Sequence, residues 1–225
     1  MATMFKSRLL FIFVMAMGLH AEVIDSIVAK VNSQPIFLSD LERQIRFESL
    51  ENKMPLPRTK LAYDHDALGR LIDQEILRQQ MTGFKFAPVV DAEVQSELKN
   101  LEKQITGTDK QLDWQQELAK AGLTESDVAE RLNSEITILH FLDARLRPTI
   151  RIDRNEMQAY YRETFLPKLE KAGGKRVPFG QVAAEIQQIL VQQRMGDAIS
   201  EWLKVLRSQA DVQITPTSNV EAETK

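Results

Sequence analysis

The side chains best suited to catalysis or metal binding are scarce in this sequence. Of its 225 residues, three are histidine and none is cysteine. Without thiols the chain has no disulfide framework, thiolate zinc site, iron–sulfur cluster or cysteine nucleophile. His65 and His140 have no second histidine at the spacing that a metal site on a helix needs. The sequence therefore predicts no catalytic residue, no bound metal and no cofactor.

The histidines themselves have structural explanations. His65 lies between Asp64 and Asp66, but three consecutive residues at a helix start point in different directions. Acidic residues at such a position are accounted for by capping and by the helix dipole. His140 lies beside the apolar stripe of a long predicted helix, where a surface or partly buried histidine is common. The sequence also contains no serine-nucleophile elbow, zinc-protease pair, phosphate-binding loop or dinucleotide fingerprint.

Apolar residues beside helix ends and prolines are the remaining candidates for a functional surface. Flexible methionine and aromatic side chains bind varied peptides when they are exposed. The alternative is that the same side chains fill the joints between helices. The candidates, which we predict to bind unfolded polypeptide, are Met54, Leu56, Phe84, Phe86, Phe165 and Leu166.

The N-terminal segment has the pattern of a secretory signal peptide. Lys6 and Arg8 precede an apolar run over residues 9–18, and Ala21 supplies a small residue at the exit. The run has about half of the roughly 20 residues that a membrane-spanning helix needs. We expect residues 1–21 to be cleaved and the chain to reach the periplasm; the alternative is a buried N-terminal helix. No cysteine follows the segment, so a lipoprotein anchor is not expected.

The composition and the apolar pattern favour long helices. Nine glycines in 225 residues lie below the average usage of about 7%. Apolar residues recur at steps of three and four, which is typical of helices with one buried face. Ser39 and Glu42 are predicted to form a capping box at the first helix. The predicted helices cover residues 39–51, 64–81, 91–105, 109–121, 124–148, 153–167 and 178–208.

Short apolar segments near both chain ends predict a small sheet. Residues 23–31 are rich in β-branched side chains, residues 35–37 follow a turn, and residues 210–214 alternate apolar and polar. A lone strand leaves its backbone groups unpaired, so the strands from the two ends must pair with one another. The prediction is a mainly α fold with a small β-sheet pairing N-terminal and C-terminal strands.

The order of these segments resembles the SurA family of periplasmic chaperones. Residues 28–41 are similar to the family's opening strand, turn and first helix, and residues 68–77 are similar to its second helix. Shorter similarities, in the later helices and in the family's returning C-terminal helix and strand, lie at residues 91–94, 123–125, 147–153, 177–182, 201–206 and 210–214.

The sequence departs from the best-known SurA members between its two similar parts. Those members carry parvulin-type prolyl isomerase domains there, whereas only Glu163 to Val177 separate the two parts here. Between the predicted signal peptide (1–21) and a polar tail that we expect to be disordered (215–225), the resemblance implies a single SurA-like core (22–214). Within the core it implies a helical N-terminal part (22–152), a linker region replacing the isomerase domain (153–176), and a returning helix and strand (177–214).

The function implied by the resemblance is a chaperone and not an enzyme. We expect an ATP-independent holdase that binds unfolded outer-membrane or other periplasmic proteins through an apolar groove. The net charge of −3 argues against nucleic-acid binding, which depends on contacts to phosphates. We also expect no stable membrane insertion, and either a monomer or a dimer that swaps a strand or helix. Two alternatives stay open: a degenerate prolyl isomerase, and a dedicated assembly or structural subunit.

Overall fold

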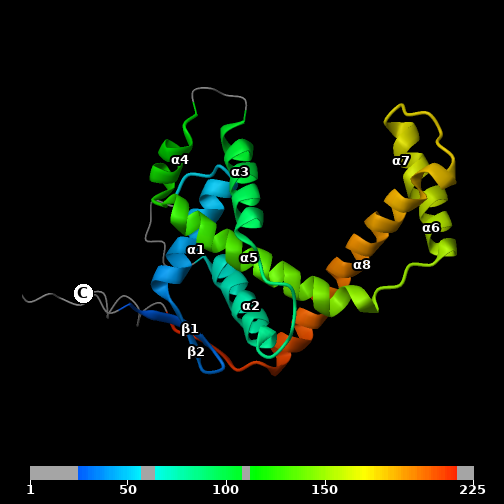
Figure 1. Ribbon diagram of the computed structural model, residues 1–225. Helices are drawn as coiled ribbons and strands as arrows, with labels where there is room; N and C mark the ends of the chain where they lie inside the picture. The colour runs from blue at the N-terminus through cyan, green and yellow to red at the C-terminus, as the bar shows by residue number, and fades with distance from the viewer. Residues whose placement is uncertain (1–24, 57–63, 108–111, 217–225) are drawn as a thin grey trace, which may run out of the picture.

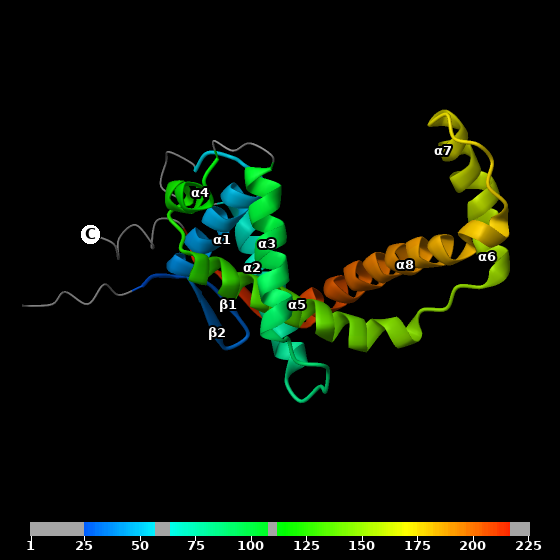
Figure 2. The same cartoon turned by 45° about the horizontal axis from the view of Figure 1, so that its top comes forward.

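The computed structural model describes residues 25–56, 64–107 and 112–216, and it is mainly helical, as predicted. Helices α1 to α4 and a small sheet form a compact body, from which α8 and the second half of α5 extend as an arm (Figure 1). Helices α6 and α7 lie at the far end of the arm in both views (Figures 1 and 2). The predicted signal peptide and residues 217–225 of the predicted tail lie outside the described residues. Within the described part of the chain, none of the helices combines the length and apolarity needed to cross a membrane.

The element bounds agree closely with the periodicity of the sequence. The strands are β1 (Ile27–Val31), β2 (Gln34–Phe37) and β3 (Val212–Ile214). The helices are α1 (Leu38–Glu51), α2 (His65–Met81), α3 (Asp91–Thr106), α4 (Trp114–Ala121), α5 (Glu125–Leu146), α6 (Arg154–Tyr160), α7 (Leu166–Lys171) and α8 (Phe179–Gln209). A 3-10 turn (Arg147–Thr149) follows α5, and a π-helical turn (Tyr161–Phe165) joins α6 to α7.

The sheet confirms the predicted pairing of the two chain ends. Its strand order is β2-β1-β3, and both pairings are antiparallel. Asn32, in the turn between β1 and β2, has a left-handed φ of 55°. Its N–H donates to the Asp211 carbonyl (2.7 Å), and its side-chain oxygen accepts the Asp211 N–H (3.0 Å). A single asparagine therefore shapes the hairpin and also holds the end of the chain beside it.

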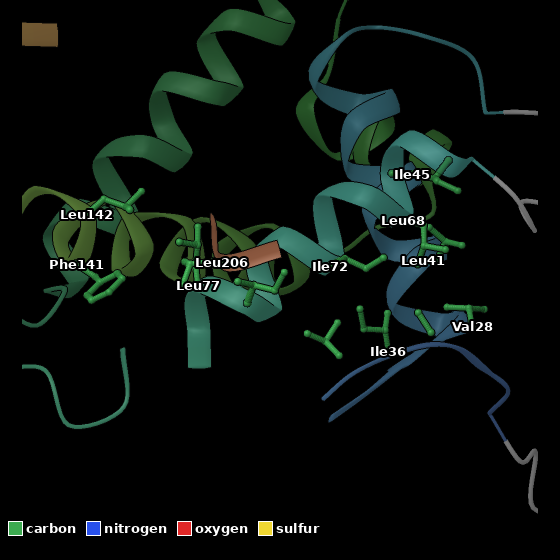
Figure 3. Close-up of a cluster of buried hydrophobic side chains, with 14 residues drawn as sticks. Val28, Ile36, Leu41, Ile45, Leu68, Ile72, Leu77, Phe141, Leu142 and Leu206 are labelled. Carbon is green, nitrogen blue, oxygen red and sulfur yellow. The ribbon is translucent and has the colours of Figure 1, made fainter. Parts of the chain in front are cut away.

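The main core joins the sheet to the body and to the arm. Its buried side chains come from β1, β2, α1, α2, α5 and α8. Figure 3 shows the row extending from Val28 at the sheet, past Leu68 of α2, to Phe141 of α5 and Leu206 of α8. Residues from opposite ends of the chain thus share one apolar interior, and burial of this surface stabilises their pairing.

A second cluster fills the body between α1, α3, α4 and the first half of α5. Helix α4 begins at Trp114 and not at the predicted residue 109. The Asp113 carboxylate caps it by accepting the Gln116 N–H (3.0 Å). The 8 residues of α4 bury Trp114 and Leu118 in the cluster, which sets this short helix against α1.

The start of α1 also differs from the prediction. Phe37 donates its N–H to the Asp40 carboxylate (3.1 Å), so the reciprocal carboxylate at this helix start is Asp40 and not Glu42. The Ser39 hydroxyl donates to the Asp25 carboxylate (2.5 Å). The predicted serine therefore ties the helix to the segment before β1 and does not cap it.

Residues 153–176, the region expected to replace the isomerase domain, form a small helical lobe with α8. The Asp153 carboxylate caps α6 by accepting the Glu156 N–H (2.9 Å). The π-helical turn ends two residues before Pro167, which has no N–H to donate, so the helix changes type beside this proline. The lobe has its own apolar cluster of Tyr161, Leu166, Val182, Ile186 and Leu190.

Helix α8 connects the lobe to the main core. Its 31 residues span about 45 Å at the usual 1.5 Å rise per residue. Ile186 and Leu190 are buried in the lobe, whereas Leu206 is buried in the main core. In its last turn, Arg207 pairs with Asp73 of α2 (2.5 Å) and donates to the Gly69 carbonyl (3.0 Å).

Candidate functional site

The six apolar residues predicted to bind polypeptide lie in three separate places. In the connection after α1, Met54 is exposed and Leu56 is half-buried. At the joint between body and arm, Phe84 and Phe86 are both half-buried. In the lobe, Phe165 is half-buried and Leu166 is buried. The structure does not bring these residues together into one surface. Binding of polypeptide by them stays a prediction.

Phe84 and Phe86 are part of an aromatic cluster that holds the joint. Their ring centroids lie 5.4 Å and 5.8 Å from that of Phe141 in α5. Trp202 of α8 lies 5.9 Å from Phe141 on the same cluster. The Arg145 guanidinium lies over the rings of Phe84 (5.5 Å) and Trp202 (5.6 Å). These two phenylalanines therefore fit the alternative interpretation, in which apolar side chains fill joints between helices.

The histidine and aspartate positions have the structural roles expected of them. Asp64 caps α2, and its carboxylate accepts the Asp66 N–H (2.9 Å). His140 Nδ1 lies 3.1 Å from the Ala87 carbonyl oxygen and its Nε2 lies 3.2 Å from the Glu93 carboxylate. His140 thus fastens the start of α3 to α5. Among the residues that the structure describes, no three His, Asp or Glu side chains are grouped to hold a metal ion.

A hollow lies between α1, α2 and α5 in the body. Its volume is about 440 Å³, within the roughly 300–1,000 Å³ usual for binding clefts. We call it the main hollow. Its apolar lining, all of it buried or half-buried, consists of Pro35, Ile36, Phe47, Leu71, Met81, Leu123 and Ile138.

Polar side chains from the same helices surround this apolar floor. Arg43 pairs with Asp40 within α1 (2.9 Å), and Arg78 pairs with Glu75 within α2 (2.6 Å). Both arginine side chains are more than half exposed, and the hydrogen bond to Glu75 raises the pKa of Arg78. On α5, the exposed Ser134 contributes a hydroxyl to the rim. The rim therefore offers charged groups of both signs and a hydroxyl around an apolar surface.

The rim carboxylate of Asp127 belongs to the N-terminal cap of α5. Asp127 accepts hydrogen bonds from the Thr124 hydroxyl (2.6 Å) and from the Thr124 N–H (2.7 Å). These bonds, the hydroxyl bond first, lower the pKa of Asp127 because they stabilise its ionised form. The carboxylate is thus held in one position at the edge of the hollow.

A second hollow of about 330 Å³ shares Gln44, Phe47, Gln74 and Arg131 with the main hollow. We call it the side hollow. Arg131 connects the three helices: its guanidinium donates to Gln74 of α2 (2.8 Å) and lies 5.4 Å from the ring centroid of Phe47 in α1. Its Nε also pairs with Glu135 one turn further along α5 (2.8 Å).

The side hollow has an electrostatic character of its own. Arg70 pairs with Glu48 through two hydrogen bonds of 2.5 Å and 2.6 Å, which raise the pKa of Arg70. The pKa of Glu135 is raised, chiefly because burial disfavours its charged form; the charge of Glu51 raises it further, while Arg131 opposes the shift. A carboxylate with a raised pKa therefore lines the side hollow.

This arrangement is suited to binding a polypeptide segment. The floor can bury apolar side chains, while the rim can hydrogen-bond a peptide backbone. These residues could not be identified from the sequence because most of them are polar and lie on three different helices. One sequence signal was available: Gln44, three residues after Leu41, falls on the apolar face of its helix, and the structure buries it. Buried polar residues on an apolar helix face indicate that the face is not simply core.

The comparison with protein families supports the resemblance noted from the sequence. A family model described as the SurA-like N-terminal domain matches residues 3–142, more than half of the chain. Every residue that lines the two hollows falls within this range. No match was found among curated proteins. The family is of a chaperone type in general and is not catalytic.

Proposed function

Because this chain belongs to the SurA-like N-terminal domain family, we propose that it is an ATP-independent periplasmic chaperone. In this proposal the chain is exported by a signal peptide that is cleaved after Ala21. It holds unfolded outer-membrane or other periplasmic proteins until they are delivered or folded. It performs no catalysis and binds no cofactor.

The main hollow is the observation that carries this proposal. It has an apolar floor, a polar rim and a position inside the stretch matched by the family. Unfolded clients destined for membrane barrels alternate apolar and polar residues along extended segments. The apolar residues of such a segment suit the floor, while the backbone amides between them suit the rim.

Binding of this type is expected to be broad and weak. A single hollow of about 440 Å³ buries only a few side chains of a client. The client must also lose conformational freedom on binding, which subtracts from the gain in buried area. Rapid release is an advantage for a holdase, because the client has to leave without an energy source.

The proposal is tested by measuring aggregation of an unfolded outer-membrane barrel protein diluted from urea. Residues 22–225 should suppress light scattering without nucleotide. The variant Ser134→Trp places a bulky ring at the rim of the main hollow and should lose most of this protection. The matched control Ser126→Trp, also exposed on α5 but outside the hollows, should keep it.

Failure of the wild-type chain to suppress aggregation at several-fold molar excess would contradict the holdase. Equal activity of the two tryptophan variants would instead show that clients bind elsewhere. The surfaces to examine next would then be Met54, the Phe84 and Phe86 joint, and the lobe.

A further inference from the structure

The side hollow carries an excess of negative charge. Four carboxylates and two guanidinium groups line it: Glu48, Glu51, Asp73 and Glu135, with Arg70 and Arg131. Glu48 pairs with Arg70, and Glu135 pairs with Arg131. Asp73 pairs with Arg207 of α8 (2.5 Å). With Arg207 counted, three guanidinium groups face four carboxylates, and Glu51 is the carboxylate that has no ion pair within the described part of the chain.

A buried hydrogen-bond acceptor lies at the same place. Gln44 is 4% exposed and lines both hollows. Its Nε2 donates to the Glu48 carboxylate (2.5 Å), whereas its Oε1 has no hydrogen-bond partner within the described part of the molecule. Buried amide oxygens are nearly always satisfied in folded proteins. Gln44 Oε1 is therefore an acceptor that lacks an N–H donor.

The aromatic ring beside Gln44 already interacts with a cation. The Arg131 guanidinium lies 5.4 Å from the centroid of the Phe47 ring, within the range of a cation–π contact. Phe47 is buried and also lines both hollows. An aromatic ring, an unsatisfied acceptor and one surplus carboxylate together suit a lysine ammonium or an arginine guanidinium.

We propose that the side hollow binds a lysine or arginine side chain of the polypeptide whose apolar segment occupies the main hollow. The cationic head group donates a hydrogen bond to Gln44 Oε1 and lies close to the carboxylates of Glu51 and Glu135. This inference rests on the proposed function and adds a sequence preference to it. Clients would be recognised by an apolar stretch followed by a basic residue.

The electrostatics of the cavity support this assignment. The burial that raises the pKa of Glu135 makes its negative charge costly, and a nearby cation would reduce that cost. The shared residues Gln44, Phe47, Gln74 and Arg131 place the two hollows side by side. One extended segment can therefore occupy both hollows with neighbouring side chains.

The test uses three fluorescent peptides that share an apolar, aromatic stretch and differ at one following position, which is Lys, Gln or Glu. Fluorescence anisotropy with the chain 22–225 gives the Kd of each peptide. We expect the Lys peptide to bind about fivefold more tightly than the Gln peptide, and the Glu peptide to bind most weakly. In the variant Glu51→Gln/Glu135→Gln, the Lys and Gln peptides should differ by less than about twofold.

The control variant Glu185→Gln/Asp197→Asn removes the same charge from exposed positions of α8 and should keep the full preference. Equal binding of all three peptides to the wild-type chain would overturn the inference and leave the holdase intact. A preference that survives Glu51→Gln/Glu135→Gln would also overturn it, because the cation would then lie elsewhere. No binding of any peptide would remove the proposed function, and this inference would fail with it.

Discussion

Replacing Phe141 by alanine should separate the arm from the body. Phe141 is 1% exposed and belongs to the main core. Truncation of a buried phenylalanine to alanine typically costs about 3–5 kcal/mol. Here three aromatic rings, those of Phe84, Phe86 and Trp202, lie 5.4 to 5.9 Å away, and such pairs each add roughly 0.5–1.5 kcal/mol beyond burial. We therefore expect a loss of about 4–5 kcal/mol, at the upper end of the range.

The assay is urea unfolding followed by tryptophan fluorescence. Trp202 reports the joint and Trp114 reports the second cluster of the body, so the background variant Trp114→Phe isolates the joint. In this background, Phe141→Ala should move the Trp202 transition to much lower urea. Far-UV circular dichroism should retain most of the helix signal, because α3, α4 and the first half of α5 pack in a separate cluster.

The control is Leu139→Ala, two residues earlier on the same helix. Leu139 is 60% exposed, and truncation at exposed positions usually changes stability by less than about 0.5 kcal/mol. A loss below about 1 kcal/mol for Phe141→Ala would refute the reasoning. The aromatic cluster would then not be what holds body and arm together, and Phe84 and Phe86 would again be candidates for client binding.

Three further results are expected. The pKa of Glu135 is raised in the folded state, so its stabilising contribution is present below the ordinary Glu pKa of about 4.3 and is lost as pH rises through the raised value. In urea unfolding, Glu135→Gln should therefore stabilise the fold near neutral pH and have no effect at about pH 3. The pKa of Asp127 is shifted in the opposite direction, so its stabilising contribution is present above about pH 3.9 and is lost as pH falls through the lowered folded value. Asp127→Asn should therefore lower the free energy of unfolding by about 0.5–2 kcal/mol near neutral pH and by less in acid. Ile186→Ala, in the lobe and 0% exposed, should cost about 2–5 kcal/mol of local stability, seen as faster hydrogen exchange in α6 and α7 without a change in α3.

The features that could be predicted from sequence were those with a local or obligatory cause. Asp64 and Thr124 cap helices because short polar side chains satisfy the first free N–H groups. Gly122 ends α4 with a left-handed φ of 66°, as expected of a glycine at that position. The sheet was predictable for a different reason, since strands at the two chain ends had no other partners. Ser39 failed as a cap because Asp40, its neighbour, forms the reciprocal bond to Phe37.

The hollows could not be predicted because they depend on the distances between helices. Gln44, Gln74 and Arg131 are unremarkable in three separate segments of sequence, and only the packing of α1, α2 and α5 brings them together. The exposure of side chains beside helix ends could not be predicted for the same reason. Phe84 follows the end of α2, yet Phe141 of the arm packs edge-on against its ring.

The part of the chain that matches the family packs against residues of the arm that lie beyond the match. The family match ends at residue 142, but Leu206 belongs to the core of the matched part. The half-buried Trp202 and Val212 pack against the same core. Without α8 and β3, strand β1 would lose a neighbour, and the buried faces of Val31 and Phe141 would be exposed to water. Helix α8 must therefore return to the body wherever the chain goes in between. The lobe of α6 and α7 provides that turn at a distance of about 45 Å, and it leaves the hollows of the body uncovered.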